Sequence, residues 1–181
     1  MLEELSEQGQ IDLYYGDESR VSLEPCVPYA WQFKGENVFM PSDRGVGLNC
    51  FALLRRDNHC RFQTTTKAID ARFIVEQLEQ LSFELRRITV VVLDNASSHR
   101  AKRVQERQPF WQQRGLFVFY LPPYSPHLNI VEVLWRKLKY QWLQAKDYLE
   151  AQGLFYQVRQ ALAAMGTQLK IHFKPFRYHL N

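Results

Sequence analysis

The stretch "VVVLDNASSH", residues 90–99, runs four apolar residues directly into the carboxylate of Asp94. A strand that is apolar on both faces is typical of the centre of a sheet that is covered on both sides. In open α/β sheets, binding sites gather at the carboxyl ends of the central strands. The stretch therefore predicts a buried strand that delivers Asp94 to a site at the edge of the sheet.

The sequence on either side of this stretch predicts a mixed sheet. Alternating or apolar runs predict three antiparallel strands before it, the first ending in a turn at Gly16, and another strand apolar on both faces after it. We expect an α/β fold with a mixed five-stranded sheet, three antiparallel strands followed by parallel strands, and helices on both faces. The expected strands are 11–16, 45–54, 60–66, 88–94 and 116–122, and the expected helices are 68–81, 99–114, 128–145 and 148–165.

Two of the expected helices carry more specific signals. Ser97 and Ser98 can cap the helix over 99–114, which we expect to break near Pro109 and to end at Gly115. The helix over 128–145 has one apolar stripe, which we expect to face the core. The stripe consists of Leu128, Val131, Trp135, Leu138 and Trp142.

Length and composition indicate one globular domain. The chain has 181 residues, of which 46% are hydrophobic and 14% aromatic, enough for a substantial core. No stretch approaches the roughly 18 to 20 apolar residues that a membrane span needs, and the acidic, polar N-terminus does not resemble a signal peptide. The cysteines, Cys26, Cys50 and Cys60, are odd in number and lack CxxC spacing. This favours reduced thiols in a cytosolic protein and argues against a zinc site.

The charge of the chain is distributed unevenly. Residues 95–146 hold nine Lys and Arg but only two acids, whereas the remainder holds fourteen basic and seventeen acidic residues. A basic half on a nearly neutral body suggests a polyanionic partner, most often nucleic acid. Solvated helix faces explain the same charges equally well on this observation alone.

Three acids follow strands or turn signals and are candidates for one site: Asp17, Asp94 and Glu132. Mg²⁺ prefers hard oxygen ligands from a few carboxylates and leaves positions for water and substrate phosphate. Two such ions can act on the attacking and the leaving oxygen of a phosphodiester. Taken singly, Asp17 also fits an Asx-turn, Asp94 fits strand closure or helix capping, and Glu132 fits a capping box with Asn129.

Three segments together resemble the DDE transposases of the mariner superfamily, in the branch carried by bacterial insertion sequences. The segments are "YYGDES" (14–19), "LDNASSH" (93–99) and "LPPYSPHLNIVEVLWRKLK" (121–139), and "AWQFKG" (30–35) is also similar to the family. They occur in the order found in the family, and the resemblance extends from about residue 10 to 165. It implies a ribonuclease-H-like fold.

The resemblance also implies roles for individual residues. The catalytic, metal-binding acids of the family fall on Asp17, Asp94 and Glu132, and the glutamate distinguishes the chain from the animal mariner branch, which has aspartate there. Asn95, His99 and Asn129 match motif positions that shape the site, although His99 fits a structural histidine equally well. The resemblance makes Glu18 a neighbour of the site and Trp135 a core residue.

The implied reaction is cleavage of a phosphodiester at a transposon end, followed by attack of the freed 3′-hydroxyl on target DNA, typically at a TA dinucleotide. It implies Mg²⁺, with Mn²⁺ as a substitute and two ions in the site, and double-stranded DNA as partner. Family members act as dimers. The basic residues beside the acids favour phosphate contacts: Arg100, Lys102, Arg103, Arg107, Arg136, Lys137 and Lys139.

Relatives usually carry N-terminal helix-turn-helix modules, for which we expect no room before the first strand. We therefore interpret residues 1–181 as a single catalytic domain with its core at about 10–165, and as one half of a frameshifted gene, a degraded gene or a cut fragment. The resemblance implies a homodimer, or an assembly with the product of a second reading frame that bears the helix-turn-helix modules. It places the protein in the bacterial cytoplasm, at the nucleoid. A DNA-binding remnant without catalysis and a ribonuclease-H-like nuclease are the alternatives.

Overall fold

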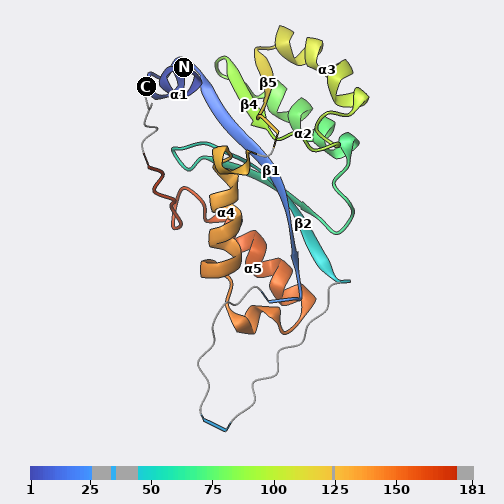
Figure 1. Ribbon diagram of the computed structural model, residues 1–181, viewed down its shortest axis with the longest axis vertical. Coiled ribbons are helices and arrows are strands. Elements are labelled where there is room, and N and C mark those ends of the chain that lie inside the picture. Colours follow the sequence, from blue (N-terminus) through green and yellow to red (C-terminus); the bar gives the residue numbers. More distant parts are fainter. Residues whose placement is uncertain (26–33, 36–44, 124, 175–181) are drawn as a thin grey trace.

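The computed structural model describes residues 1–25, 34–35, 45–123 and 125–174 (Figure 1). The residues outside these ranges include Cys26, the first four residues of "AWQFKG" and residues 175–181 at the C-terminus. The strands are β1 (Asp12–Ser22), β2 (Gly47–Leu54), β3 (Cys60–Thr65), β4 (Thr89–Leu93) and β5 (Leu116–Tyr120). The helices are α1 (Leu2–Glu7), α2 (Ala71–Phe83), α3 (Lys102–Gln113), α4 (Val131–Lys137) and α5 (Ala151–Ala163), with short turns η1 (Pro126–Leu128), η2 (Leu138–Trp142) and η3 (Ala145–Tyr148).

The strands form one five-stranded sheet in the order β3-β2-β1-β4-β5. β1, β2 and β3 pair antiparallel, whereas β4 pairs parallel with both β1 and β5. This is the mixed sheet that the sequence predicts. No helix in the described ranges is long and apolar enough to cross a membrane.

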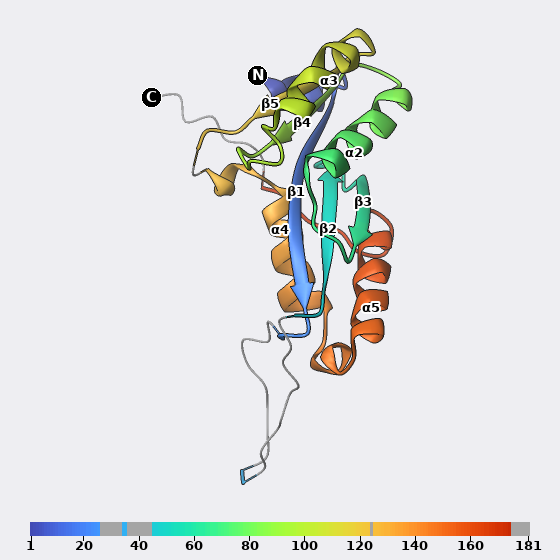
Figure 2. The ribbon, with the colours of Figure 1, turned by 90° about the vertical axis from the view of Figure 1, so that its right-hand side faces the viewer.

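The two faces of the sheet are covered by different helices. One core cluster joins α4 and α5 to Val90 and Val92, and the other joins α2 and α3 to Val91 and Leu93. In Figure 2, α4 and α5 run beside the lower part of β1, β2 and β3, and α2 and α3 lie toward the upper part. Every residue of β4 is buried, which confirms the prediction of a central strand covered on both sides.

The predicted turn at Gly16 is wrong, because β1 continues through this residue to Ser22. A Cβ at Gly16 would lie 2.6 Å from Cδ2 of Leu93 and 2.8 Å from Cδ2 of Leu53. Glycine is needed here for close packing inside the sheet and not for a turn. As a result, Asp17 lies within a strand and does not form the Asx-turn that its sequence context also allows.

β5 and α3 differ from the predictions in detail. β5 is an edge strand, and Phe117 and Phe119 on its open face are 40% and 59% exposed, so it is not covered on both sides. α3 begins only after Ala101, without a side-chain cap, so Ser97 and Ser98 do not cap it. Pro109 lies inside α3 and does not break it.

The helix predicted over 128–145 is shorter and less regular. α4 ends at Lys137, and the next turn, η2, is a π-helix closed by the bond from Leu143 N to Leu138 O of 3.1 Å. Leu128 is 37% exposed, whereas Leu134, outside the predicted stripe, is fully buried.

The N-terminal helix α1 was not predicted because its sequence is polar. It is held by the buried Glu3, which accepts a 2.5 Å hydrogen bond from Tyr15 and pairs with Arg56 at 2.7 Å.

Candidate active site

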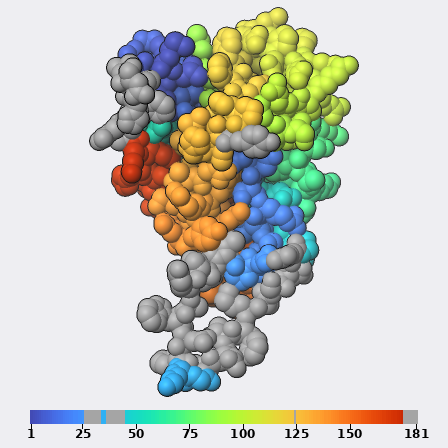
Figure 3. All heavy atoms as spheres, viewed as in Figure 1, coloured from blue at the N-terminus to red at the C-terminus, as the bar shows by residue number. Residues whose placement is uncertain are grey.

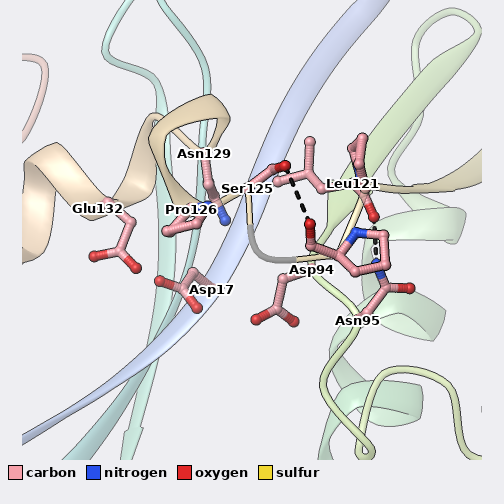
Figure 4. A pocket seen from close by; sticks show the side chains of 10 residues that line it. Asp17, Asp94, Asn95, Leu121, Ser125, Pro126, Asn129 and Glu132 are labelled. Carbon is pink, nitrogen blue, oxygen red and sulfur yellow. Dashed lines mark hydrogen bonds between the residues drawn. The ribbon is translucent and has the colours of Figure 1, made fainter.

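The three predicted acids line one cavity of about 380 Å³ (Figure 4). Asp17 comes from β1, Asp94 directly follows β4, and Glu132 lies in the first turn of α4. The parallel pairing of β1 with β4 brings the first two acids to neighbouring strands. The packing of α4 against β1 adds the third.

Asp17 is held from across the core. It is 9% exposed, and its Oδ2 accepts a 3.0 Å hydrogen bond from Nε1 of Trp135. Burial, together with the negative charges of Glu132 and Glu18, raises the pKa of Asp17 to about 7. Trp135 is the core residue that the sequence predicts, but its indole N–H also positions the acid. A buried tryptophan N–H needs a hydrogen-bond acceptor, and this need was the one signal in the sequence for the contact with Asp17.

Asp94 is held from both sides by its own loop. Oδ1 of Asp94 accepts a 2.9 Å hydrogen bond from the backbone N–H of Ala96 and lies 2.6 Å from Nδ1 of His99. The hydrogen bond from His99 lowers the pKa of Asp94 despite partial burial. Asp94 therefore closes the strand, as one interpretation of the sequence holds, and also presents an ionised carboxylate to the cavity.

His99 is fully buried between two carboxylates. Its Nδ1 faces Asp94, and its Nε2 lies 2.9 Å from Oε2 of Glu18 as an ion pair. Burial alone would lower the pKa of His99, but the two carboxylates raise it to about 9. The imidazolium is thus both a structural link and a direct contact of a predicted site residue. Local patterns in the sequence did not predict the role of Glu18 in this link, because Glu18 and His99 lie far apart in the chain.

Asn129 joins the start of α4 to β1. It is buried, donates a 3.1 Å hydrogen bond to the carbonyl of Gly16 and accepts one of 3.1 Å from the N–H of Val131. The capping box with Glu132 is not formed, because Asn129 bonds Val131 instead. The carboxylate of Glu132 is consequently left to face the cavity.

Asn95 links the two loops that border the cavity. Its side-chain amide donates to the carbonyl of Leu121, and its Oδ1 accepts a 2.7 Å hydrogen bond from Arg100. The guanidinium of Arg100 also lies 5.1 Å above the centre of the Tyr120 ring. Asn95 thus shapes the cavity wall, as the motif implies, and Arg100 supports that wall.

Comparison with protein families gives a match to the DDE superfamily endonuclease model over residues 12–154. The chain belongs to the DDE superfamily endonucleases. No curated protein sequence compared with the chain matches it.

Solved structures show the same fold at low sequence identity. The Mos1 mariner paired-end complex with Mn matches with a TM-score of 0.55 and 15% identity over 90% of this chain and 56% of that chain. The catalytic core domain of BIV integrase matches with a TM-score of 0.51 and 14% identity over 84% of this chain and 81% of that chain. The simian T-cell lymphotropic virus intasome in complex with PP2A regulatory subunit B56 gamma matches with a TM-score of 0.58 and 13% identity, over 84% of this chain and 47% of that chain. The predicted ribonuclease-H-like fold is confirmed, and the chain spans just over half the length of the Mos1 chain.

The predicted basic residues of this chain fall into two groups. Arg136 and Lys139 line a second hollow, of about 610 Å³, which shares Asp17 and Glu132 with the first. The others line neither hollow: Arg100 bonds Asn95, Lys102 pairs with Glu106, Arg107 pairs with Glu79, Lys137 bonds Gln141, and Arg103 is exposed.

The three acids fit divalent cations by charge and donor type. Among the described residues, no Lys or Arg pairs with Asp17, Asp94 or Glu132. The imidazolium of His99 pairs with Asp94, so the three acids together keep a net negative charge. The same part of the chain contains no set of three His, Cys, Asp or Glu side chains already arranged around one ion. Carboxylates that repel each other are expected to stay apart in the absence of a cation, and this repulsion adds to burial in raising the pKa of Asp17.

Proposed function

We propose that this chain catalyses metal-dependent cleavage of DNA and strand transfer in the transposition of an insertion sequence. The observation that carries the proposal is the convergence of Asp17, Asp94 and Glu132 on one cavity, with no Lys or Arg paired to them among the described residues. Membership of the DDE superfamily endonucleases supports the reaction class.

Asp17, Asp94 and Glu132 would hold Mg²⁺ or Mn²⁺, through carboxylate oxygens that both ions accept. Two ions, when bound, would activate the attacking oxygen and stabilise the leaving oxygen of a phosphodiester. Trp135 fixes one oxygen of Asp17, and His99 fixes one oxygen of Asp94. Each acid therefore keeps its other oxygen for a ligand, and Asn129 holds the start of α4 so that Glu132 faces both.

The proposed substrate is double-stranded DNA, as a transposon end and a target that contains TA. The Mos1 matches are described as a paired-end complex with a transposon end and a pre-cleavage transpososome, which supports a DNA partner here. We propose that residues 1–181 act as one catalytic domain with its core at about 10–165, and that it works as a homodimer or with a subunit that supplies helix-turn-helix modules, in the cytoplasm at the nucleoid.

The test is nicking of supercoiled plasmid by the purified chain in Mg²⁺ or Mn²⁺. D94N and E132Q should abolish nicking, whereas E106Q, which removes an exposed acid on α3, should retain it. Equal nicking by all variants would contradict the assignment of the acids. A protein that neither nicks plasmid nor joins a precut 3′-hydroxyl end to it, even when fused to a helix-turn-helix module, would contradict the proposed function. Cleavage of RNA in a hybrid duplex in place of DNA would favour the ribonuclease alternative.

A further inference from the structure

The second hollow is a groove between β1 and the α4–η2 helix, here called the α4 groove. Beyond the residues that it shares with the carboxylate cavity, it is lined by Glu18 and Ser19 of β1, by His127 of η1, and by Val133, Trp135, Arg136, Lys139 and Tyr140 of the helix. In Figure 3 the surface of α4, in orange, lies directly beside the surface of β1, in blue. The groove is therefore continuous with the site where the acids meet.

The cations of the α4 groove form a row with one of the acids. Glu132, Arg136 and Lys139 are spaced by four and three residues, which places them on one face of a helix. Arg136 and Lys139 lie roughly 6 Å and 10 Å further along the helix than Glu132, at about 1.5 Å per residue. Within the described part of the chain, neither has a hydrogen bond or an ion pair. Their charges are thus free for a ligand, whereas the adjacent Lys137 bonds Gln141.

An aromatic ring follows these cations. Tyr140 lines the groove and is 52% exposed, so its ring is accessible to a ligand in the groove. It belongs to the π turn η2, and π turns inside helices occur frequently at functional sites. Next to the acids, the groove thus offers two cations without partners among the described residues and an exposed aromatic side chain. Such groups bind single-stranded nucleic acid, through the backbone phosphates and base stacking.

We propose that the α4 groove holds a single DNA strand that leads away from the phosphate to be cut. Arg136 and Lys139 contact successive phosphates, and Tyr140 stacks on a base that is not paired. A row of cations on one helix face follows one backbone, and a base can stack on Tyr140 only when it has left the duplex. The inference rests on the proposed function only in that the acids mark the phosphate to be cut. It adds that the DNA end is unpaired beside that phosphate.

The experiment measures equilibrium binding of the full chain to fluorescent DNA in EDTA, so that no cleavage occurs. Two hairpins are compared, one with a flush end and one with an unpaired 3′ tail, from about 50 mM salt upward. The wild type should prefer the tailed hairpin. Y140A should lose that preference by about tenfold, and Y140F should keep it because the ring remains. 2-Aminopurine in the tail should be quenched by the wild type and by Y140F, but not by Y140A.

The phosphate contacts are tested in the same assay. R136Q and K139Q should each flatten the dependence of log Kd on log salt by about 0.7 for a single strand. K146Q, an equal loss of charge on exposed η3, is the matched control, and K137Q should weaken binding less than K139Q. Arg136 and Tyr140 are exposed and Lys139 is half-buried, so these variants are expected to fold, which circular dichroism checks.

Equal losses in K137Q, K139Q and K146Q, or equal binding of both hairpins by the wild type, would overturn the α4 groove as the strand path. These results are separable from the proposed function. If nicking depends on Asp94 but the binding data are of this kind, the proposed reaction stands and the assignment of the groove is wrong. The expected binding pattern without nicking would leave the groove intact and the reaction wrong. A wild type that binds neither hairpin would overturn the α4 groove, and plasmid nicking would decide the reaction separately.

Discussion

The indole Nε1 of Trp135 donates a 3.0 Å hydrogen bond to Oδ2 of Asp17, two residues that lie 118 positions apart in the chain. The contact joins α4 to β1 inside the core and sets the direction of a carboxylate that lines the candidate active site. Packing and site geometry are therefore coupled through one side chain.

Replacing Trp135 with phenylalanine keeps an aromatic ring in the core but removes the donor. W135F should lower the free energy of unfolding by about 2 kcal/mol, because a hydrogen bond to a buried carboxyl group is lost. Plasmid nicking should fall at least tenfold, about 1.4 kcal/mol of barrier, since Asp17 is no longer fixed. W142F, at a half-buried tryptophan on the same helix, should have little effect on nicking. Equal nicking by W135F and the wild type would show that the bond does not position Asp17.

The link between Glu18, His99 and Asp94 predicts a coupled loss of stability. H99A leaves two partly exposed carboxylates without the imidazolium between them, and should cost about 2 kcal/mol, as for lost hydrogen bonds to charged groups. Adding E18Q should recover part of this cost, because it removes one of the two uncompensated charges. Urea unfolding of the wild type, both single variants and the double variant measures the coupling. Additivity within about 0.5 kcal/mol would contradict the link.

Glu79 on α2 predicts a dependence of stability on pH far from the site. Partial burial would raise its pKa, but hydrogen bonds from Arg114, Arg107 and Trp111 outweigh this and lower it to about 2. The folded-state pKa lies below the ordinary value of 4.5, so the stabilisation is complete above that value and is lost as the pH falls toward 2.

E79Q should therefore be less stable than the wild type at pH 7, by about 2 kcal/mol for hydrogen bonds to a charged group. The difference should shrink between about pH 5 and pH 2, as protonation removes the same charge from the wild type. Chemical denaturation across this range tests it. E76Q, which breaks an exposed pair with Arg72, should change little at any pH. A constant difference between E79Q and the wild type from pH 7 to 2 would rule out the explanation.

The close packing at Gly16 predicts opposite effects for two identical substitutions. G16A places a methyl group against Leu93 and Leu53, and should destabilise the chain by about 1–3 kcal/mol. G153A lies within α5, where a Cβ meets only the Glu150 side chain, at 3.5 Å, and should stabilise it by about 0.5–1 kcal/mol. Thermal unfolding of both variants measures the contrast, and a G16A protein as stable as G153A would show that the sheet can absorb the methyl group.

Much of the fold follows from local patterns. The apolar run 90–93 predicts a central strand because only a strand with two covered faces can consist of such residues, and the structure buries all of them. The order of strands and helices follows from the change between a period of two and a period near 3.6. Local patterns fail where burial depends on partners from elsewhere. β5 has the same composition as a central strand, but helix packing covers only the face of Leu116, Val118 and Tyr120, so Phe117 and Phe119 stay exposed.

The candidate acids could be chosen from the sequence, because carboxylates beside strand ends and helix starts are recognisable from residue type and spacing. The sequence by itself thus determined the strand pattern, the identity of Asp17, Asp94 and Glu132, and the family. Only the tertiary structure decided that Gly16 is a packing residue, that Trp135 and His99 hold the acids, and that Arg136 and Lys139, but not Lys137, line the groove. Hydrogen bonds and ion pairs depend on distances of a few ångströms between groups far apart in the chain, and those distances are set by how the elements pack, not by local spacing.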